Sequence, residues 1–215
     1  TTETIRLPAS VSQQLVRLKQ QMHLSWEGLF ATALGSLLHE ALPRADRLLL
    51  GLQTGRPDQT RLPNRTRRDE ILLNASEIVG ALAHDAPVFL KWNAGIQPLE
   101  QLRDVETQLD AQPGRSADYG VLRYLSDNSY LLEPLQTVPR PQVSLAWLGD
   151  WDAHREPHGV LEGVVAAGHA NGEQAALQVN AYWQQNELVL ECHGALAQDW
   201  SARLEQGLRG FAQLP

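Results

Sequence analysis

The sequence predicts an α/β fold in which a mixed sheet is flanked by helices. Several segments repeat apolar residues at the three- and four-residue spacing of an amphipathic helix. Shorter segments rich in β-branched and aromatic residues lie between them, and such an alternation forms one layered unit. The chain has 215 residues, of which 43% are hydrophobic and 20% are charged. It can therefore bury a substantial core and is not disordered as a whole.

Helices are expected where apolar residues recur on one face. Ser10 is expected to cap the first helix and Ser25 the second, which ends before Pro43 because proline cannot continue a helix. Pro98 suits the first turn of a later helix, and Pro113 follows the end of that helix. The predicted helices span residues 10–22, 25–42, 98–112, 119–125 and 199–213.

The predicted strands span residues 47–53, 86–92, 142–148, 160–167, 175–183 and 187–193. The last two are expected to form a hairpin that turns at Gln185 and Asn186. A polar loop is expected over residues 54–69, and a second loop around Pro134, Pro139 and Pro141. We expect the first two helices to pack on one side of the sheet and the last helix on its far side.

The composition excludes several functional classes. With a net charge of −7, the chain is not expected to bind nucleic acid. Its single cysteine, Cys192, excludes an internal disulfide framework and a cysteine-rich zinc site. Apolar runs are far shorter than a membrane span, and the opening residues lack the features of a signal peptide. We therefore expect a cytoplasmic protein that binds no membrane or, because the initiator methionine is missing, a piece of one.

Positive charge is concentrated between Arg44 and Arg68. This window holds seven arginines and two aspartates, in a chain whose net charge is −7. Such a run is either a solvated loop or a patch that meets an anionic partner, such as a phosphate or an acidic protein surface. The sequence leaves both interpretations open.

The chain lacks the common catalytic motifs. It contains neither a G-x-S-x-G nucleophile elbow nor a phosphate-binding loop. His154 and His158 have the separation of zinc ligands, but Pro157 lies between them and spacing places no third ligand. Cys192 and His193 are neighbours on a predicted strand, so their side chains point to opposite faces and cannot form a dyad. We therefore expect no catalytic residue and no metal site.

Two segments resemble motifs of a known family. Residues 112–125, QPGRSADYGVLRYL, resemble the P-x-x-G-x-G-Y-G-x-L-R-Y-L motif of epimerization domains in nonribosomal peptide synthetases. Residues 142–152, QVSLAWLGDWD, are similar to the F-N-Y-L-G-Q-F-D motif of the same domains. Residues 50–56, LGLQTGR, fall where the condensation superfamily has a strand ending in Gly-Arg. Val79-Gly80 and Pro87-Val88 fall where it has V-G-W-F-T-x-x-Y-P.

The resemblance implies a chloramphenicol-acetyltransferase-like fold. In this superfamily two such lobes enclose a tunnel that receives the phosphopantetheine arm of a carrier protein. The catalytic His-His-x-x-x-Asp-Gly motif belongs to the N-terminal lobe, and this chain does not contain it. Leu7-Pro8-Ala9 and the helix that ends in ALGSLLHEAL resemble the start of the C-terminal lobe.

We therefore expect residues 1–215 to be a C-terminal lobe alone. The implied partners are the N-terminal lobe of the same domain and a peptidyl carrier protein. No cofactor is expected to bind this chain directly, because the 4′-phosphopantetheine arm belongs to the carrier protein.

The resemblance also assigns site residues. The candidates that face the tunnel or the substrate are Leu52, Thr54, Arg56, Tyr119, Ala146 and Trp147. The candidates that shape the motifs are Gly55, Gly80, Pro87, Pro113, Gly120, Leu148 and Gly149. Read without the resemblance, the glycines are turn or close-packing residues and the aromatic residues belong to the core. Arg56 suits a structural ion pair as well as a phosphate contact.

The sequence departs from the family at polar and aromatic motif positions. Leu52 stands where epimerization domains have the glutamate of E-G-H-G-R, while Ala146 and Trp147 replace an asparagine and a tyrosine. A leucine cannot exchange a proton, so we expect a half-domain that is catalytically incomplete. A degenerate docking or spacer lobe within a synthetase is the alternative, and a free-standing acyltransferase would lack any base.

A half-domain also leaves its tunnel wall open to water. The chain has six tryptophans against three phenylalanines, which suits an exposed apolar or aromatic face. We expect residues 50–56, 79–88 and 143–149 to form this face.

Overall fold

The computed structural model describes residues 1–54, 84–111, 129–150 and 175–215. Three predicted elements lie outside these residues: most of the polar loop at 54–69, the short helix at 119–125 and the strand at 160–167.

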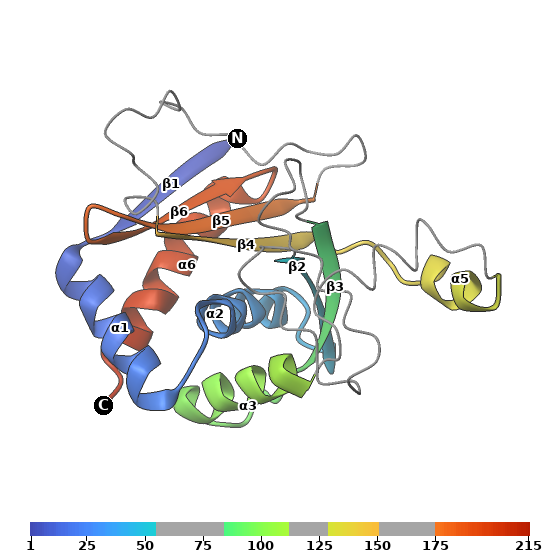
Figure 1. Cartoon of the computed structure of the whole chain (residues 1–215), viewed down its shortest axis with the longest axis horizontal. Coiled ribbons are helices and arrows are strands. Elements are labelled where there is room, and N and C mark those ends of the chain that lie inside the picture. Colours follow the sequence, from blue (N-terminus) through green and yellow to red (C-terminus); the bar gives the residue numbers. More distant parts are fainter. Residues whose placement is uncertain (55–83, 112–128, 151–174) are drawn as a thin grey trace, which may run out of the picture.

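A six-stranded mixed sheet forms one layer of the fold (Figure 1). Its strands, in spatial order, are β1 (Thr2–Leu7), β6 (Glu187–His193), β5 (Leu177–Gln184), β4 (Val143–Asp150), β2 (Arg47–Thr54) and β3 (His84–Lys91). The β2–β4 and β4–β5 pairs are parallel, and the other three pairs are antiparallel. The predicted mixed sheet is therefore confirmed. Strands β2 and β3 turn steeply against the other strands, so the sheet curls around the helices (Figure 1).

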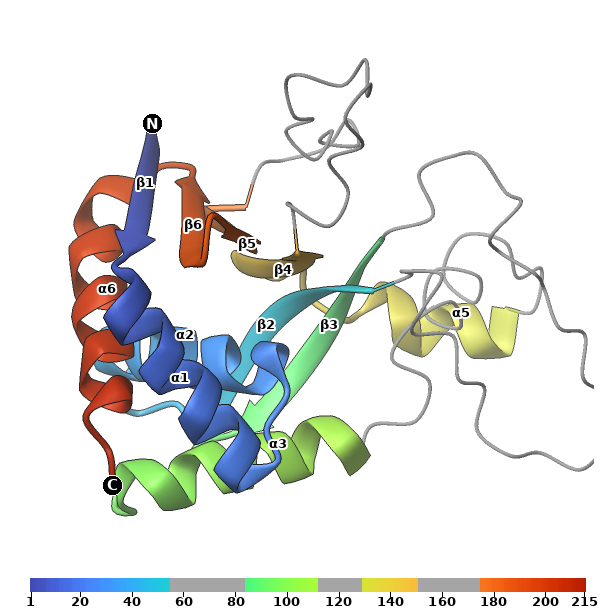
Figure 2. The same cartoon turned by 60° about the vertical axis from the view of Figure 1, so that its left-hand side comes forward.

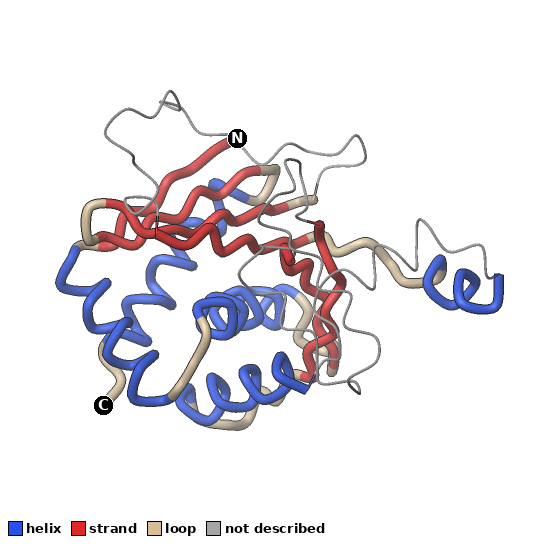
Figure 3. The backbone as a smooth tube through the Cα atoms, viewed as in Figure 1, coloured by secondary structure: helices blue, strands red, loops and turns tan. Residues whose placement is uncertain are grey.

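Four helices cover the same face of the sheet (Figures 1 and 2). They are α1 (Ala9–Met22), α2 (Trp26–Ala41), α3 (Pro98–Ala111) and α6 (Ala197–Ala212). The central helix, α2, is apolar almost all round and packs against α3, α6, β2 and β4. The separation of helix layer and sheet is plain in the backbone trace (Figure 3).

The expectation that the last helix lies on the far side of the sheet is wrong. Helix α6 packs against α1, α2 and β1. Its apolar stripe of Trp200, Leu204 and Leu208 joins the same core as the other helices. Because the opposite face of β5 and β6 is largely polar, it offers this stripe no comparable apolar partner.

Local signals placed most helix ends correctly. The Ser25 side chain accepts a hydrogen bond from the Gly28 N–H and caps α2 as predicted. The prediction for Ser10 is wrong, because α1 begins at Ala9 after Pro8 and has no side-chain cap. The segment around Pro134 also differs from the predicted loop, since it contains helix α5 (Ser129–Gln136).

The sequence patterns missed strand β1. It pairs with β6 along its full length and buries Ile5 and Leu7. The buried Ser12 hydroxyl donates to the Leu7 carbonyl at 2.9 Å and accepts from the Leu188 N–H at 3.0 Å, which ties α1 to both strands. Two buried apolar residues in a short segment give little periodicity, so only pairing with the distant β6 reveals this strand.

The predicted hairpin between β5 and β6 is confirmed. Gln185 and Asn186 have φ values of 53° and 63°, the left-handed pair that a tight two-residue hairpin turn requires. The turn sets the register in which Ala181 faces Leu190 and Val179 faces Cys192. All four of these side chains are buried in the core below the sheet.

Candidate functional site

The structure brings two of the family-like segments together. Strands β2 and β4 run parallel, with Gly51 opposite Ser144 and Leu52 opposite Leu145. A Cβ at Gly51 would lie 3.1 Å from the Ser144 Cβ, so the glycine permits this close approach. Ligands of open α/β sheets bind beyond the carboxyl ends of parallel strands. The shared carboxyl end of β2, β4 and β5 is therefore the candidate site.

Two of the predicted tunnel residues lie on opposite faces of the sheet. Leu52 is 3% exposed and belongs to the core beneath the sheet. Ala146 is 2% exposed, and it points away from the helices because its neighbour Leu145 points toward them. Strand alternation therefore separates the two side chains, and both are buried. Their assignment to a tunnel wall stays a prediction.

Trp147 joins an aromatic cluster at the carboxyl ends of β4 and β5. Its ring centroid lies 5.3 Å from that of Trp26 and 5.8 Å from that of Phe30. Trp183 meets Trp26 edge to face at 5.8 Å. The Lys19 Nζ lies 5.7 Å above the Trp26 ring, within cation–π range. The three tryptophans are half-buried, so the cluster is a packed boundary of the core with its outer edge in reach of solvent.

Two of the motif-shaping residues have clear backbone roles. A register shift between Trp147 and Gly149 bends β4, with the half-buried Leu148 at the irregularity. Gly149 has a φ of 82°, which favours glycine. Pro87 lies opposite Gly51 on the edge strand β3, where a missing N–H is tolerated.

A side chain from α3 covers the edge strand β3 at Lys91. The Gln108 side-chain amide accepts from the Lys91 N–H at 2.7 Å and donates to the Lys91 carbonyl at 2.9 Å. An amide on α3 thus takes the place of a further strand, which limits edge-to-edge association.

Several predicted residues lie outside the described part of the chain. Thr54 is the last residue of β2, and nothing is described of its side chain. The remaining residues outside the described ranges are Gly55, Arg56, Gly80, Pro113, Tyr119, Gly120, His154 and His158. Their assignments stay predictions.

Exposed large hydrophobic side chains are few among the described residues. Leu42, Phe89 and Tyr130 are exposed, and they belong to three different parts of the fold. The expected apolar face at residues 50–56, 79–88 and 143–149 therefore stays a prediction.

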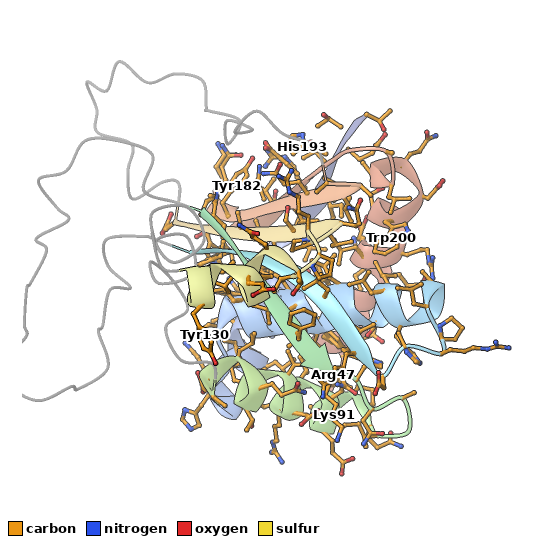
Figure 4. All side chains as sticks on the ribbon, turned by 90° about the vertical axis from the view of Figure 1, so that its right-hand side faces the viewer. Arg47, Lys91, Tyr130, Tyr182, His193 and Trp200 are labelled. Atoms are coloured by element: carbon orange, nitrogen blue, oxygen red, sulfur yellow. The ribbon has the colours of Figure 1, made fainter. Side chains whose placement is uncertain are left out.

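The sequence analysis missed a polar network on the face of the sheet opposite the four described helices (Figure 4). The Tyr182 hydroxyl donates to Glu191 Oε1 at 2.9 Å. His193 Nε2 lies 3.6 Å from Glu191 Oε2, and His193 Nδ1 lies 3.1 Å from the Thr2 hydroxyl. The alternation of Glu191 and His193 on one strand, with Tyr182 across the hairpin, is the signal that could have found it.

The Tyr182 phenol acts as the hydrogen-bond donor to Glu191 in this network. Burial first, and then the hydrogen bond to Glu191, raises the pKa of Tyr182 to about 12. The phenol therefore keeps its proton at neutral pH and serves as a donor. Because Thr2, Tyr182 and His193 come from β1, β5 and β6, the network links three strands.

Cys192 and His193 do point to opposite faces, as predicted. Cys192 is fully buried in the core, and burial raises its pKa to about 12. Such a thiol is a packing residue without nucleophilic character.

The described residues contain no cluster of three His, Cys, Asp or Glu side chains that could hold a metal ion. None of their helices is long and apolar enough to cross a membrane.

Curated relatives of this chain are large synthases. The chain is 26% identical to a mycosubtilin synthase protein of Bacillus subtilis over 145 residues, which are 66% of this chain and 5% of that protein. It is 40% identical to the chondramide synthase cmdD of Chondromyces crocatus over 88 residues, which are 40% of this chain and 2% of that protein. No family model matches the sequence.

Solved structures share the fold over nearly the whole chain. The epimerization domain from the third module of tyrocidine synthetase B has a TM-score of 0.68 and 20% identity, over 99% of this chain and 46% of that one. The first condensation domain of the CDA synthetase has a TM-score of 0.60 and 14% identity, over 100% of this chain and 46% of that one. The X-domain solved in complex with OxyB from teicoplanin biosynthesis has a TM-score of 0.61 and 18% identity, over 99% and 45%. The chain thus spans a little under half of each solved chain.

Proposed function

We propose that this chain, which has the fold of the condensation and epimerization domains of nonribosomal peptide synthetases, serves as the C-terminal lobe of such a domain. One observation carries the proposal. The epimerization domain of tyrocidine synthetase B matches 99% of this chain with only 46% of its own length. A chain that aligns completely with half of a two-lobed domain is expected to work with a second lobe.

The proposed role is to form one wall of a tunnel for a carrier-bound aminoacyl or peptidyl thioester. The other wall belongs to the N-terminal lobe, and the thioester arrives on the 4′-phosphopantetheine arm of a peptidyl carrier protein. The pairing of β2 with β4 supports this role, because it places two motif segments at the carboxyl ends of parallel strands.

Catalytic incompleteness is part of the proposal. Inversion at Cα needs a proton removed on one face and returned on the other, which two acid–base groups do most simply. The resemblance places one in the N-terminal lobe and the other at position 52, where this chain has a buried leucine. Losing one general acid–base group costs roughly 10²–10⁴-fold in rate.

Solvent deuterium tests this incompleteness. The complete parent domain is incubated in D₂O with an aminoacyl thioester on its cognate carrier protein, and deuterium at Cα is followed by mass spectrometry. We expect incorporation close to the uncatalysed rate. Incorporation as fast as in an authentic epimerization domain would contradict the proposal that the domain is catalytically incomplete.

Hydrogen exchange tests the lobe assignment separately. Adding the N-terminal lobe should protect backbone amides at the carboxyl ends of β2 and β4. Protection confined to α1 and α6 would contradict the assignment of this edge as the tunnel wall.

A non-catalytic docking or spacer lobe is the second candidate. Leu52 in the core favours it, and an X-domain of similar fold has been solved in complex with another protein, OxyB. The upstream sequence of the parent protein separates the two candidates. An intact His-His-x-x-x-Asp-Gly motif favours the domain lobe, and its absence favours the docking lobe.

A further inference from the structure

Two cations lie opposite each other at one end of the ribbon formed by β2 and β3. Arg47 begins β2, and its partner across the antiparallel pair is Lys91, the last residue of β3. Both residues are exposed, and they lie next to each other at the end of the ribbon (Figure 4). The candidate site lies toward the other end of β2, which finishes at Thr54. The two cations are therefore separate from it.

The backbone brings the two cations close together. Gln108 on α3 binds both the N–H and the carbonyl of Lys91, so these groups point away from β2. One step further along the ladder, the Trp92 N–H donates to the Asp46 carbonyl. Arg47 and Lys91 therefore form a non-hydrogen-bonded pair, whose Cα atoms lie only about 4.5 Å apart. Because like charges directly opposite each other repel, this pair destabilises the chain when nothing neutralises it.

No carboxylate neutralises the pair within the part of the chain that the structure describes. The ion pairs between described residues involve other basic side chains, namely Arg6, His193, Arg203 and Arg209. Asp104, on the same helix as Gln108, accepts from the Gln108 amide at 3.0 Å. Two adjacent cations are thus left without an acidic partner, although the whole chain has a net charge of −7.

An apolar pair lies beside the cations on the same face of the ribbon. Leu49 is opposite Phe89 in the ladder, two residues along each strand from the cations. The sequence neighbours of this pair belong to the core, namely Leu48, Leu50, Val88 and Leu90. Strand alternation therefore turns Leu49 and Phe89 away from the helices. Leu49 is half-buried, but Phe89 is 45% exposed.

Pro141 borders the apolar pair. A Cβ at Gly51, the next position of β2 on this face, would lie 3.3 Å from the Pro141 Cβ. Arg140, which is exposed, precedes this proline in the chain. We call the resulting patch the ribbon surface, and its members are Arg47, Leu49, Phe89, Lys91 and Pro141.

The chemistry of the ribbon surface favours an acidic protein segment as its occupant. Adjacent cations are complementary to carboxylates. A small inorganic anion could neutralise them but would leave Phe89 in water, whereas a peptide with apolar side chains among its acidic residues could cover both. A long polyanion such as nucleic acid would be repelled by the negative charge of the rest of the chain.

We propose that the ribbon surface binds an acidic segment of a partner protein. Arg47 and Lys91 contact carboxylates of this segment, and Phe89 packs against an apolar side chain between them. The arginine-rich window from Arg44 to Arg68 includes Arg47, so at this position the proposal favours the anionic partner over the solvated loop. It is independent of the function proposed above, because it uses no residue at the carboxyl ends of β2 and β4.

A short acidic peptide, DELFED, is the probe. The full chain is titrated into the fluorescein-labelled peptide, and binding is followed by fluorescence anisotropy. We expect saturable binding that is about fivefold or more stronger than that of NQLFQN, in which amides replace every carboxylate. Raising sodium chloride from about 0.05 M to about 0.5 M should weaken binding of DELFED, because salt screens exposed charges.

Substitutions locate the binding surface. Arg47→Gln together with Lys91→Gln should weaken binding of DELFED by about fivefold or more. The matched control is Arg17→Gln together with Arg103→Gln, which removes the same charge at exposed positions of α1 and α3 and should change binding by less than about twofold. Phe89→Ser should also weaken binding, because it removes the exposed ring and keeps both cations.

Thermal melting checks that the first double variant folds. Because that variant removes a repulsion, it should melt at the same temperature as the parent chain or higher. A lower melting temperature would show that the chain itself satisfies both cations and would overturn the proposal.

Other results would overturn it as well. They are the absence of saturable binding, equal binding of NQLFQN, equal losses in the two double variants and unchanged binding by Phe89→Ser. Tighter binding of phosphatidylglycerol vesicles or of single-stranded DNA than of DELFED would assign the ribbon surface to a different class of partner.

Discussion

The carboxylate of Glu106 on α3 holds Ser25 at the first turn of α2. Glu106 Oε2 accepts from the Ser25 N–H at 3.0 Å and from the Ser25 hydroxyl at 2.9 Å. The Ser25 oxygen in turn accepts from the Gly28 N–H at 2.9 Å. Negative charge is favoured at a helix N-terminus, so one carboxylate both completes the cap and joins α3 to the central helix.

Removing this carboxylate should destabilise the fold. Glu106→Ala leaves the Ser25 N–H without its partner and removes a charge from the N-terminus of α2. We expect a loss of about 1–2 kcal/mol in the free energy of unfolding, measured by urea denaturation. Glu133→Ala, at an exposed position of α5, is the control and should change it by less than about 0.5 kcal/mol. Equal effects of the two substitutions would show that the Glu106 contact adds nothing.

Alanine substitutions at two helical glycines should change the stability of the fold in opposite directions. A Cβ at Gly35 would overlap the ring of Trp92, whereas a Cβ at Gly207 would meet nothing within 4 Å. Gly35→Ala should destabilise by about 1–3 kcal/mol through overpacking. Gly207→Ala should stabilise by about 0.5–1 kcal/mol through helix propensity. Thermal melting checks both, and stabilisation by Gly35→Ala would contradict the described packing of Trp92 on α2.

The free energy of unfolding should fall at alkaline pH, in part because the Cys192 thiol ionises. Burial raises the pKa of this thiol from 9.0 to about 12, so the folded chain holds the proton more tightly than the unfolded chain. The resulting stabilisation is complete below pH 9 and is lost as the pH rises from about 9 through 12. The slope contributed by the thiol approaches about 1.4 kcal/mol per pH unit.

Urea midpoints between pH 8 and 11 under reducing conditions measure this slope. Cys192→Ala should lower stability at pH 8 and flatten its decline above pH 9. An unchanged decline would show that the thiol is not protected. Rapid alkylation of Cys192 in the folded chain at pH 8 would lead to the same conclusion.

A glutamate at position 52 should disrupt the fold and should not supply a base. Leu52 is 3% exposed in the core, so Leu52→Glu would bury a carboxylate without a partner. We expect a loss of more than about 3 kcal/mol. Leu42→Glu, the same substitution at a side chain that is 54% exposed, should be nearly neutral. Circular dichroism with urea denaturation compares them, and similar stabilities would indicate that position 52 faces solvent.

Local patterns in the sequence were sufficient for many elements. The spacing of apolar residues placed α1, α2, α3 and α6, and Ser25 marked the start of α2. Gln185 and Asn186 placed the hairpin between β5 and β6. These features depend on residues that are close in the chain, such as a cap three residues from its donor, so the sequence is enough to predict them.

Other features depend on which distant segments meet. Strand β1 is defined by pairing with β6, whose partner residues lie almost the whole chain away. The face on which α6 packs depends on where the other helices leave their apolar surfaces, and helical periodicity does not contain that information. Gln101 looks like an ordinary helical residue in the sequence, but it is only 6% exposed in the folded chain.

At the candidate site, too, some features follow from the sequence and others from contacts between distant segments. The sequence by itself determined that Leu52, Ala146 and Trp147 occupy family-like motifs, because motif order is a property of the chain. Only the tertiary structure decided that β2 lies parallel to β4 and that Leu52 and Ala146 face opposite sides. The physical reason is that side chains alternate along a strand, so a single residue of register moves a side chain from the core to the other face. That register is set by packing against α2 and by the neighbouring strands, which local sequence does not specify.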